Sequence, residues 1–242
     1  MIKKALEYIV AMGEAKEHSI HGEIYTDKEL YRVGRHIPRA NPIEMSTLSS
    51  LVQYIRSNAD TMSEKMIIQV ENPTTVRLFS NLDENRNREV LVTVKANVPS
   101  FPWERFVDHE SFCIGAQAKF VDDATTDKAL VLKFAGTVET GSVAEYGDDG
   151  ITQKATVKTG ILNKEAGVVP NPVTLRPYRT FMEVEQPASN FVFRMKMDKL
   201  GGVECALFEA DGGAWKNAAT WNVHEYLESE LNNLRDKFIV IS

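Results

Sequence analysis

Four of the nine prolines in this 242-residue chain lie within eighteen residues, inside the stretch VVPNPVTLRPYRTFMEVEQPASNFVFRM that runs from Val168 to Met195. Proline has no amide hydrogen and a fixed φ, so it is disfavoured in helix interiors and in central strands. The stretch is therefore restricted to extended chain, sheet edges and turns. We expect Pro170 and Pro172 to keep the chain extended before a strand that begins near Val173.

The second part of this stretch is expected to form an edge and then a regular strand. Pro177 cannot donate to a ladder and forces an edge or a bulge, and Gln186-Pro187 is expected to turn the chain after an extended segment over 180–184. Apolar and polar residues alternate over 190–196, as in a half-buried strand. One interpretation is a long β-arm whose prolines protect its edge against pairing with other chains.

A second interpretation is a recognition strip for an anion. Guanidinium groups bind anions through paired hydrogen bonds, and nearby aromatic rings add stacking. The arginines would meet the anion beside Tyr178 and Phe181. The candidate binding residues of this strip are Arg176, Tyr178, Arg179, Arg194 and Lys196.

Hydrophobic periodicity and capping residues predict four helices. They cover residues 2–12, a segment from Asn41-Pro42 to residue 57, a segment that Asp108 opens and that runs to residue 120, and residues 217–234. Runs of β-branched and aromatic residues between turn signals predict the strands. These cover residues 23–25 and 29–33 as a hairpin, and then 66–70, 75–79, 89–98, 129–138, 151–159, 173 onward, 190–196, 203–208 and 238–241.

These elements predict an α+β fold, mostly antiparallel sheet with three or four packed helices. We expect one compact unit over residues 1–242, and a subdivision into 1–122 and 123–242 stays open. The halves share a loose order of strands, helix and strand without a residue-level repeat, so duplication stays open as well. Trp215 and Trp221 flank the start of the last helix, and they are the candidates for a place in the core or at an interface.

The charge balance and the cysteine content exclude some classes of protein. The net charge is −6, and residues 1–122 carry 15 basic and 17 acidic side chains, against 13 and 17 in 123–242. This even balance disfavours a long basic footprint for duplex nucleic acid. Cys113 and Cys205 have no partner at metal-ligand spacing and are expected to be reduced and buried in a cytosolic protein. Glu7 breaks the N-terminal apolar run, so neither a signal peptide nor a membrane span is expected.

The sequence contains no motif with the specificity of a catalytic site. It lacks G-x-G-x-x-G, the Walker-type phosphate loop and the G-x-S-x-G elbow. HEYLE at 224–228 begins like a zinc-protease helix, but Glu228 replaces the second histidine, which favours a solvated helix face. His18 and His21 are expected at a surface turn. YGDDG at 146–150 could hold a divalent cation, although a polar turn explains it. We therefore expect no enzyme, no cofactor and no metal site.

Six blocks of sequence are distinctive and together cover nearly the whole chain. They are TLSSLVQYIRSN, NPTTVRLFSNL, SFCIGAQAKFVDD, YGDDGITQKATVKTGI, VPNPVTLRPYRTFMEVEQPASNFVFRM and CALFEADGGAWKNAATWNVHEYLESEL. In these blocks the chain resembles a family of bacteriophage and prophage early-region proteins of unknown function. The resemblance implies a place near phage replication and recombination genes, in the cytoplasm of the infected bacterium. It implies no activity, cofactor or catalytic residue.

These observations lead to three hypotheses of function. The first is a non-enzymatic phage accessory protein that binds protein partners from phage or host and self-associates as a homo-oligomer. The second is a protein that binds single-stranded nucleic acid through the recognition strip, where base stacking would add about 1 to 3 kcal/mol per base. The third is an antagonist of host anti-phage defence, for which the sequence offers no motif.

Overall fold

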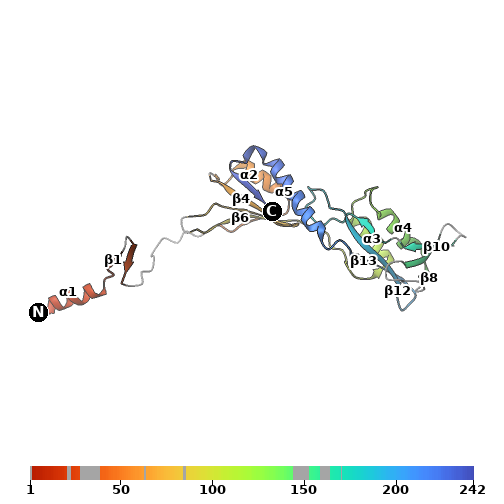
Figure 1. Ribbon diagram of the computed structural model, residues 1–242, viewed down its shortest axis with the longest axis horizontal. Coiled ribbons are helices and arrows are strands. Elements are labelled where there is room, and N and C mark those ends of the chain that lie inside the picture. Colours follow the sequence, from red (N-terminus) through yellow and green to blue (C-terminus); the bar gives the residue numbers. More distant parts are fainter. Residues whose placement is uncertain are drawn as a thin grey trace. The chain divides into compact units, whose positions relative to one another are not determined.

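The computed structural model describes residues 2–20, 23–27, 39–62, 64–83, 86–143, 153–158, 164–169 and 171–242. The chain divides into two units, Met1–Arg39 and Ala40–Ser242, and each is described by itself. Within the described residues, five α-helices accompany antiparallel and mixed sheets (Figure 1), which confirms the predicted α+β class.

The first unit contains a helix and a hairpin, and none of its described residues is buried. α1 (Ile2–Gly13) confirms the helix predicted over 2–12. β1 (Glu17–Ile20) and β2 (Glu23–Thr26) pair antiparallel, with His18 opposite Tyr25. The strand predicted at 23–25 is therefore confirmed, but it pairs with a strand that precedes it. The partner predicted at 29–33 lies outside the described residues.

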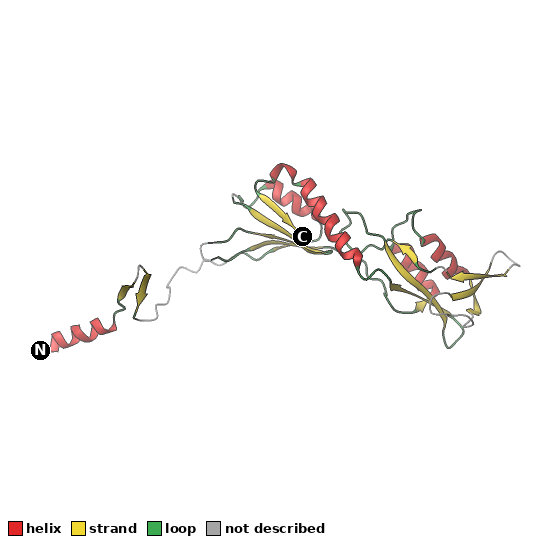
Figure 2. Cartoon of the chain, viewed as in Figure 1, coloured by secondary structure: helices red, strands yellow, loops and turns green. Residues whose placement is uncertain are grey.

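The larger sheet of the second unit has the strand order β14-β4-β5-β6-β3. Its members are β3 (Ile43–Met45), β4 (Met66–Asn72), β5 (Thr75–Phe79), β6 (Val90–Lys95) and β14 (Phe238–Ile241). β4, β5 and β6 are antiparallel neighbours, whereas β14 runs parallel to β4 and β3 runs parallel to β6. α2 (Leu48–Ser57) and α5 (Ala214–Glu230) both lie on one side of this sheet (Figure 2).

The first hydrophobic cluster fills the space between this sheet and its two helices. Alternate strand residues and the apolar stripes of α2 and α5 are buried, as period-2 strands and amphipathic helices require. The fully buried members are Leu48, Leu51, Ile68, Val76, Leu78, Val92, Val94, Val223 and Leu227. The apolar faces predicted for these helices and strands are therefore confirmed.

The second sheet has the order β11-β12-β13-β7 and supports its own core. Its strands are β7 (Val107–Asp108), β11 (Val173–Leu175), β12 (Ser189–Met197) and β13 (Val203–Glu209). α3 (His109–Lys119) and α4 (Lys128–Thr137) complete this core. Phe191, Phe193 and Met195 are buried on one face of β12, as their alternation predicted. A smaller sheet contains β8 (Val138–Val143), β9 (Gln153–Lys158) and β10 (Lys164–Val169).

The start of α2 differs from its prediction. Asn41-Pro42 was expected to open this helix, but Ile43–Met45 forms β3 beside β6, and the helix begins at Leu48. The side chain of Thr47 accepts a hydrogen bond from the amide of Ser50 at 3.2 Å. A threonine cap therefore takes precedence over the Asn-Pro signal, because pairing with β6 fixes the preceding residues in an extended conformation.

One segment predicted as a strand and one predicted as extended chain have other conformations. Residues 129–138 fall mainly in α4, where Val131 and Ala135 are buried one turn apart, because their β-branched and aromatic content is compatible with a buried helix face. Residues 180–184 form bends and a turn, in which the amide of Val184 donates to the carbonyl of Phe181. The turn expected at Gln186-Pro187 therefore occurs a few residues earlier.

The two cores do not follow a boundary at residue 122. The first cluster combines residues 48–94 with residues 181–240, and the second contains residues 112–207. The chain crosses between them through residues 176–188, which we call the crossing segment. This segment contains part of the proline-rich stretch and three of the five candidate binding residues.

Candidate interaction surfaces

The crossing segment begins beside the end of α3. The carbonyl of Arg176 accepts from the amide of Val121 at 2.8 Å, and the amide of Tyr178 donates to the carbonyl of Lys119 at 3.0 Å. Pro177 lies between them, in an isolated bridge with Phe120. Arg176 and Tyr178 on either side of Pro177 make the backbone hydrogen bonds. The missing amide hydrogen of Pro177 therefore leaves no backbone acceptor unpaired. The edge predicted at Pro177 is therefore a short bridge.

Arg179 lies in an aromatic cage. Its side chain is almost fully buried, and its guanidinium carbon lies 4.0 Å from the ring centroid of Trp215 and 5.5 Å from that of Phe191. Trp103 is also within cation–π range, at 5.7 Å. Nη1 lies 2.7 Å from Oε1 of Glu209. The arginine predicted to meet a ligand is thus engaged within the fold.

Arg179 remains protonated at neutral pH although its side chain is buried. Burial lowers the pKa of its guanidinium to about 10, and the carboxylates of Glu209 and Asp211 oppose that shift. Nη2 donates to Oγ of Ser189, and Nε1 of Trp215 shares Oε1 of Glu209 at 3.1 Å. The cage therefore holds a cation at neutral pH and pairs both of its terminal nitrogens with groups of this chain, whereas Nε is buried without a hydrogen-bond partner.

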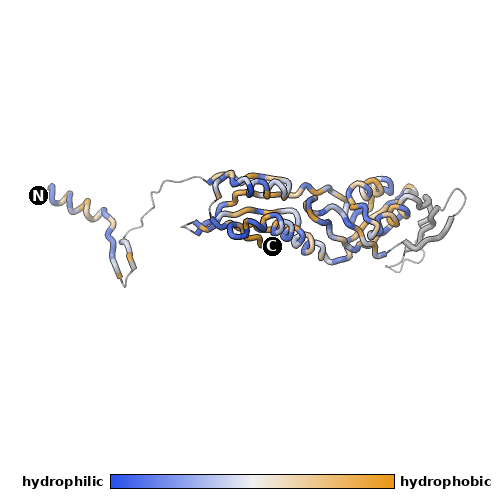
Figure 3. The backbone as a smooth tube through the Cα atoms, turned by 90° about the horizontal axis from the view of Figure 1, so that it is seen from above, coloured by the Kyte–Doolittle hydropathy of each residue, from blue (hydrophilic) through white to orange (hydrophobic). Residues whose placement is uncertain are grey.

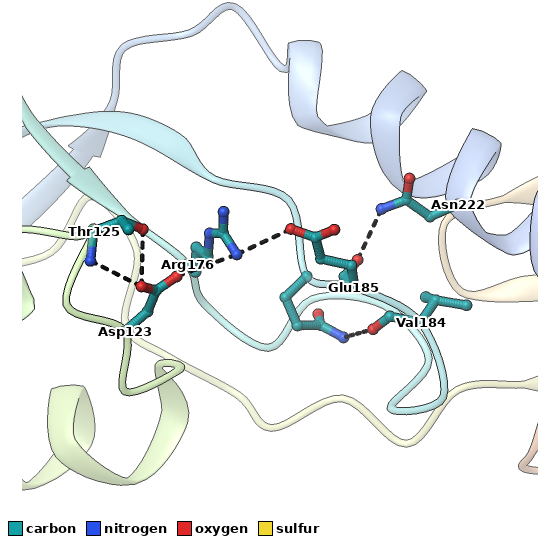
Figure 4. A network of polar contacts seen from close by, with 7 residues as sticks. Asp123, Thr125, Arg176, Val184, Glu185 and Asn222 are labelled. Atoms are coloured by element: carbon teal, nitrogen blue, oxygen red, sulfur yellow. Dashed lines mark hydrogen bonds and ion pairs between the residues drawn. The ribbon is translucent and has the colours of Figure 1, made fainter.

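Arg176 joins two acidic residues from different segments (Figure 4). Its Nη1 lies 3.2 Å from Oδ2 of Asp123 and 3.0 Å from Oε1 of Glu185. Hydrogen bonds from Thr125, and then the charge of Arg176, lower the pKa of the Asp123 carboxyl. The carbonyl of Glu185 accepts from Nδ2 of Asn222 in α5 at 2.9 Å. Arg176 therefore belongs to a network that links the crossing segment to α5.

The rest of the crossing segment is fixed by Gln186. Its Oε1 accepts from the amides of Arg179 and Thr180, and its Nε2 donates to the carbonyl of Phe181. Thr180 also donates through Oγ1 to the carbonyl of Pro73, and Phe181 is buried in the first core. The segment is thus a packed connection between two cores, whereas the sequence suggested an arm.

The other two members of the strip contact different elements. Lys196 lies 3.1 Å from Oε2 of Glu204 and 4.3 Å from the ring centroid of Phe106. Arg194 is half-buried on β12, on the face opposite Phe193. Lys196 pairs with Glu204 near the beginning of β13, whereas Arg179 pairs with Glu209 at its end. The five residues therefore do not form a continuous cationic surface.

Trp221 is the more exposed of the two interface candidates. Trp215 is half-buried against Arg179, whereas Trp221 is 54% exposed. The Trp221 ring stacks on His224 at 5.2 Å with an interplanar angle of 4°. Both residues line a hollow of about 490 Å³ beside an ion pair of 3.0 Å between Glu228 and Arg235. This hollow contains the two ends of the HEYLE motif.

A second groove lies between α2 and α5, with a volume of about 350 Å³. Arg56 closes it through a 2.7 Å ion pair with Glu230. Burial, and then the charges of Glu230 and Glu183, raise the pKa of Tyr226 there. Within the described residues, no group of three or more His, Cys, Asp or Glu side chains could hold a metal ion.

The two thiols lie in or beside the second core. Cys205 is fully buried, and burial raises its pKa to about 12. Burial also raises the pKa of the half-buried Cys113. Both thiols are protonated at neutral pH, which disfavours a nucleophilic role. His18 is exposed on β1, whereas His21 and residues 146–150 lie outside the described part of the chain.

The largest exposed apolar surface of the first unit is one face of α1. Its apolar residues recur at helical spacing and are 56 to 79% exposed: Ile2, Leu6, Ile9, Val10 and Met12. Figure 3 shows the hydrophobic residues spaced along this helix. The apolar spacing of residues 2–12 predicted this helix but not the exposure of its apolar face.

Among the described residues, no helix is both long enough and apolar enough to cross a membrane. No protein-family model, curated protein or solved structure matches this chain.

Proposed function

We propose that this chain is a non-enzymatic binding protein that self-associates, and that it acts as a phage accessory protein in the cytoplasm of an infected bacterium. The six blocks of phage-like sequence support the biological setting. The single observation that carries the molecular proposal is the exposed apolar face of α1.

The first unit cannot bury this face by itself. It contains 39 residues, and chains below about 40 residues rarely sustain a core of their own. α1 has 12 residues, which is the lower limit for an isolated helix in water. An apolar face of this width is therefore stable only when another surface covers it.

A second copy of α1 is the occupant that the charges favour. Lys3 and Lys4 lie at the beginning of the helix, whereas Glu14 follows its last residue. Antiparallel packing of two copies places the basic end of each helix against the acidic end of the other. Burial of a side chain such as Leu6 contributes about 1.5 to 3 kcal/mol.

The test introduces a charge into the apolar face. Leu6→Glu is expected to weaken self-association at least about tenfold, because 1.4 kcal/mol corresponds to a factor of ten. Light scattering after size-exclusion chromatography measures the mass as a function of concentration. Ala11→Glu is the matched control, because Ala11 lies opposite Ile2 and Ile9 on the helix and receives the same charge.

Two outcomes contradict the proposal. A full-length chain that remains at its monomer mass of 27.2 kDa at every concentration excludes self-association. Equal effects of Leu6→Glu and Ala11→Glu exclude the apolar face of α1 as the contact.

A further inference from the structure

The outer strands of the two larger sheets differ in how well they are protected against pairing with another chain. β11 has three residues between Pro172 and Pro177, and β7 has two residues. β3 has three residues, follows Pro42 and includes Glu44. Proline, charge and short length are the devices that block an edge. These three edge strands are therefore protected against pairing with another chain.

β14 contains neither a proline nor a charged residue. Its four residues, Phe238–Ile241, are all apolar, and within the described residues no element pairs with its outer side. An apolar edge strand presents unpaired amides and carbonyls and is a template for a further strand.

One face of β14 also continues an uncovered apolar row. Ile239 lies opposite Ile67, Ile67 lies opposite Phe79, and Phe79 lies opposite Val90, so these four residues share one face of the sheet. Ile239 is 46% exposed, and Ile241 on the same face is 44% exposed. α2 and α5 cover the opposite face (Figure 2).

α5 is the helix that lies beside this edge. α5 contacts β4 and β14, whereas α2 contacts β6, so α5 lies on the β14 side of the sheet. Its Trp221 is stacked on His224 and points to solvent, because it lies two residues before the buried Val223 and therefore on the opposite face of the helix.

We propose that β14 pairs antiparallel with β14 of a second copy of this chain across a two-fold axis, with Val240 opposite its counterpart. In this register Ile239 of one copy lies opposite Ile241 of the other, on the same face, so the apolar row of each copy is extended by one isoleucine of its partner. Beyond Ile241 the row becomes polar, because Ile241 lies opposite Gln69 in its own sheet. Because α5 is the helix beside β14, a two-fold axis at this edge also brings the α5 helices of the two copies to the same side of the joined sheet.

A second copy suits this edge because an antiparallel strand can be its own partner. Residues 239 and 241 are both isoleucine, so the pattern is symmetric about Val240. This inference deepens the proposed self-association and adds a contact that does not involve α1.

The experiment uses the full chain with two sets of substitutions. The edge variant is Ile239→Lys with Ile241→Lys, and the helix variant is Leu6→Glu with Ile9→Glu. Ile43→Lys is the matched control, because Ile43 is an equally exposed isoleucine, at 42%, on the opposite edge strand. Light scattering after size-exclusion chromatography gives the mass of each assembly.

Two different two-fold contacts on each chain give wild-type assemblies larger than a dimer. We expect each variant alone to form a dimer of about twice 27.2 kDa and the combined variant to be monomeric. The Ile43→Lys control is expected to match the wild type. Both edge isoleucines are nearly half exposed, so circular dichroism is expected to show the wild-type fold.

The outcomes separate the two proposals. If the helix variant is already monomeric, or if the edge variant keeps the wild-type mass, the β14 contact is wrong while self-association through α1 stands. If only the edge variant lowers the mass, the role of α1 is wrong while the β14 contact stands. A monomeric wild type contradicts both and leaves the edge free for a strand of a different protein.

Cysteine cross-linking tests the register without relying on the lysine variants. Opposed residues of antiparallel strands have Cα atoms about 4.5 to 5.5 Å apart, within the range of a disulfide. The variant Ile239→Cys with Ile241→Cys is expected to form covalent dimers under a mild oxidant, whereas Ile43→Cys is not. Equal yields of covalent dimer from the two variants overturn the register.

Discussion

At the scale of single residues, Arg179 shows how burial changes the meaning of a sequence pattern. An arginine beside tyrosine, phenylalanine and proline is typical of an anion-binding strip. In the structure its guanidinium is stacked on Trp215 and paired with Glu209. The partners come from β13 and α5, far from Arg179 in sequence, so local reasoning could not identify them.

The environment of Arg179 predicts a structural role. Arg179→Ala is expected to lower the free energy of unfolding by about 3 kcal/mol, because removal of one member of a buried pair leaves the other uncompensated. The value is at the lower end of the known range because Glu209 remains partly exposed. Urea denaturation of the wild type and of Arg179→Ala measures this difference in the free energy of unfolding.

Lys196→Ala serves as the control for Arg179. Lys196 pairs with Glu204 at a half-exposed position, so its loss is expected to cost less than about 1 kcal/mol. If Arg179→Ala leaves stability unchanged and abolishes salt-sensitive binding of an oligonucleotide, Arg179 is a ligand-binding residue and the structural role is wrong.

At the scale of elements, the helix caps explain which predictions succeeded. Asp108 was predicted to open α3, and its Oδ1 accepts from the amide of Ser111 at 2.8 Å. Asn41 was predicted to open α2 on an equally good local signal, but pairing of Ile43–Met45 with β6 takes precedence. Capping residues and apolar periodicity thus identify α1, α3, α5 and most of the strands. They fail where a distant partner decides the conformation.

The cap of α3 predicts a pH dependence. Hydrogen bonds from the amide and hydroxyl of Ser111 lower the pKa of the Asp108 carboxyl, so the folded state favours the carboxylate. This contribution is complete above the ordinary aspartate pKa of about 3.9 and is lost as the pH falls through the lowered value. Asp108→Ala is expected to cost about 1 kcal/mol at neutral pH.

Asp108→Asn separates the charge from the hydrogen-bond acceptor. Asparagine can still cap the helix, so its cost at neutral pH is expected to be smaller than that of alanine. The difference in unfolding free energy between wild type and Asp108→Asn is expected to narrow as the pH is lowered below about 4. A difference that is constant from pH 7 to pH 3, measured by urea denaturation, contradicts this role of the carboxylate.

At the scale of the whole molecule, the sequence predicted the class of the fold, but not the surfaces on which the proposed self-association depends. Among the described residues of the first unit, none is buried against α1, and β14 is exposed because it lies at the end of the strand order. Neither property is visible in local patterns. Trp221 was identified as an interface candidate from its size alone. In the structure it is exposed and stacked on His224, and its place in an interface stays a prediction.

Self-association of the full chain is the central claim of this account, and its mass in solution tests that claim most directly. The account predicts that the wild-type chain, examined by sedimentation over a wide range of concentrations, forms an assembly larger than a dimer of its 27.2 kDa chain. A single species at the monomer mass over the whole range would contradict it.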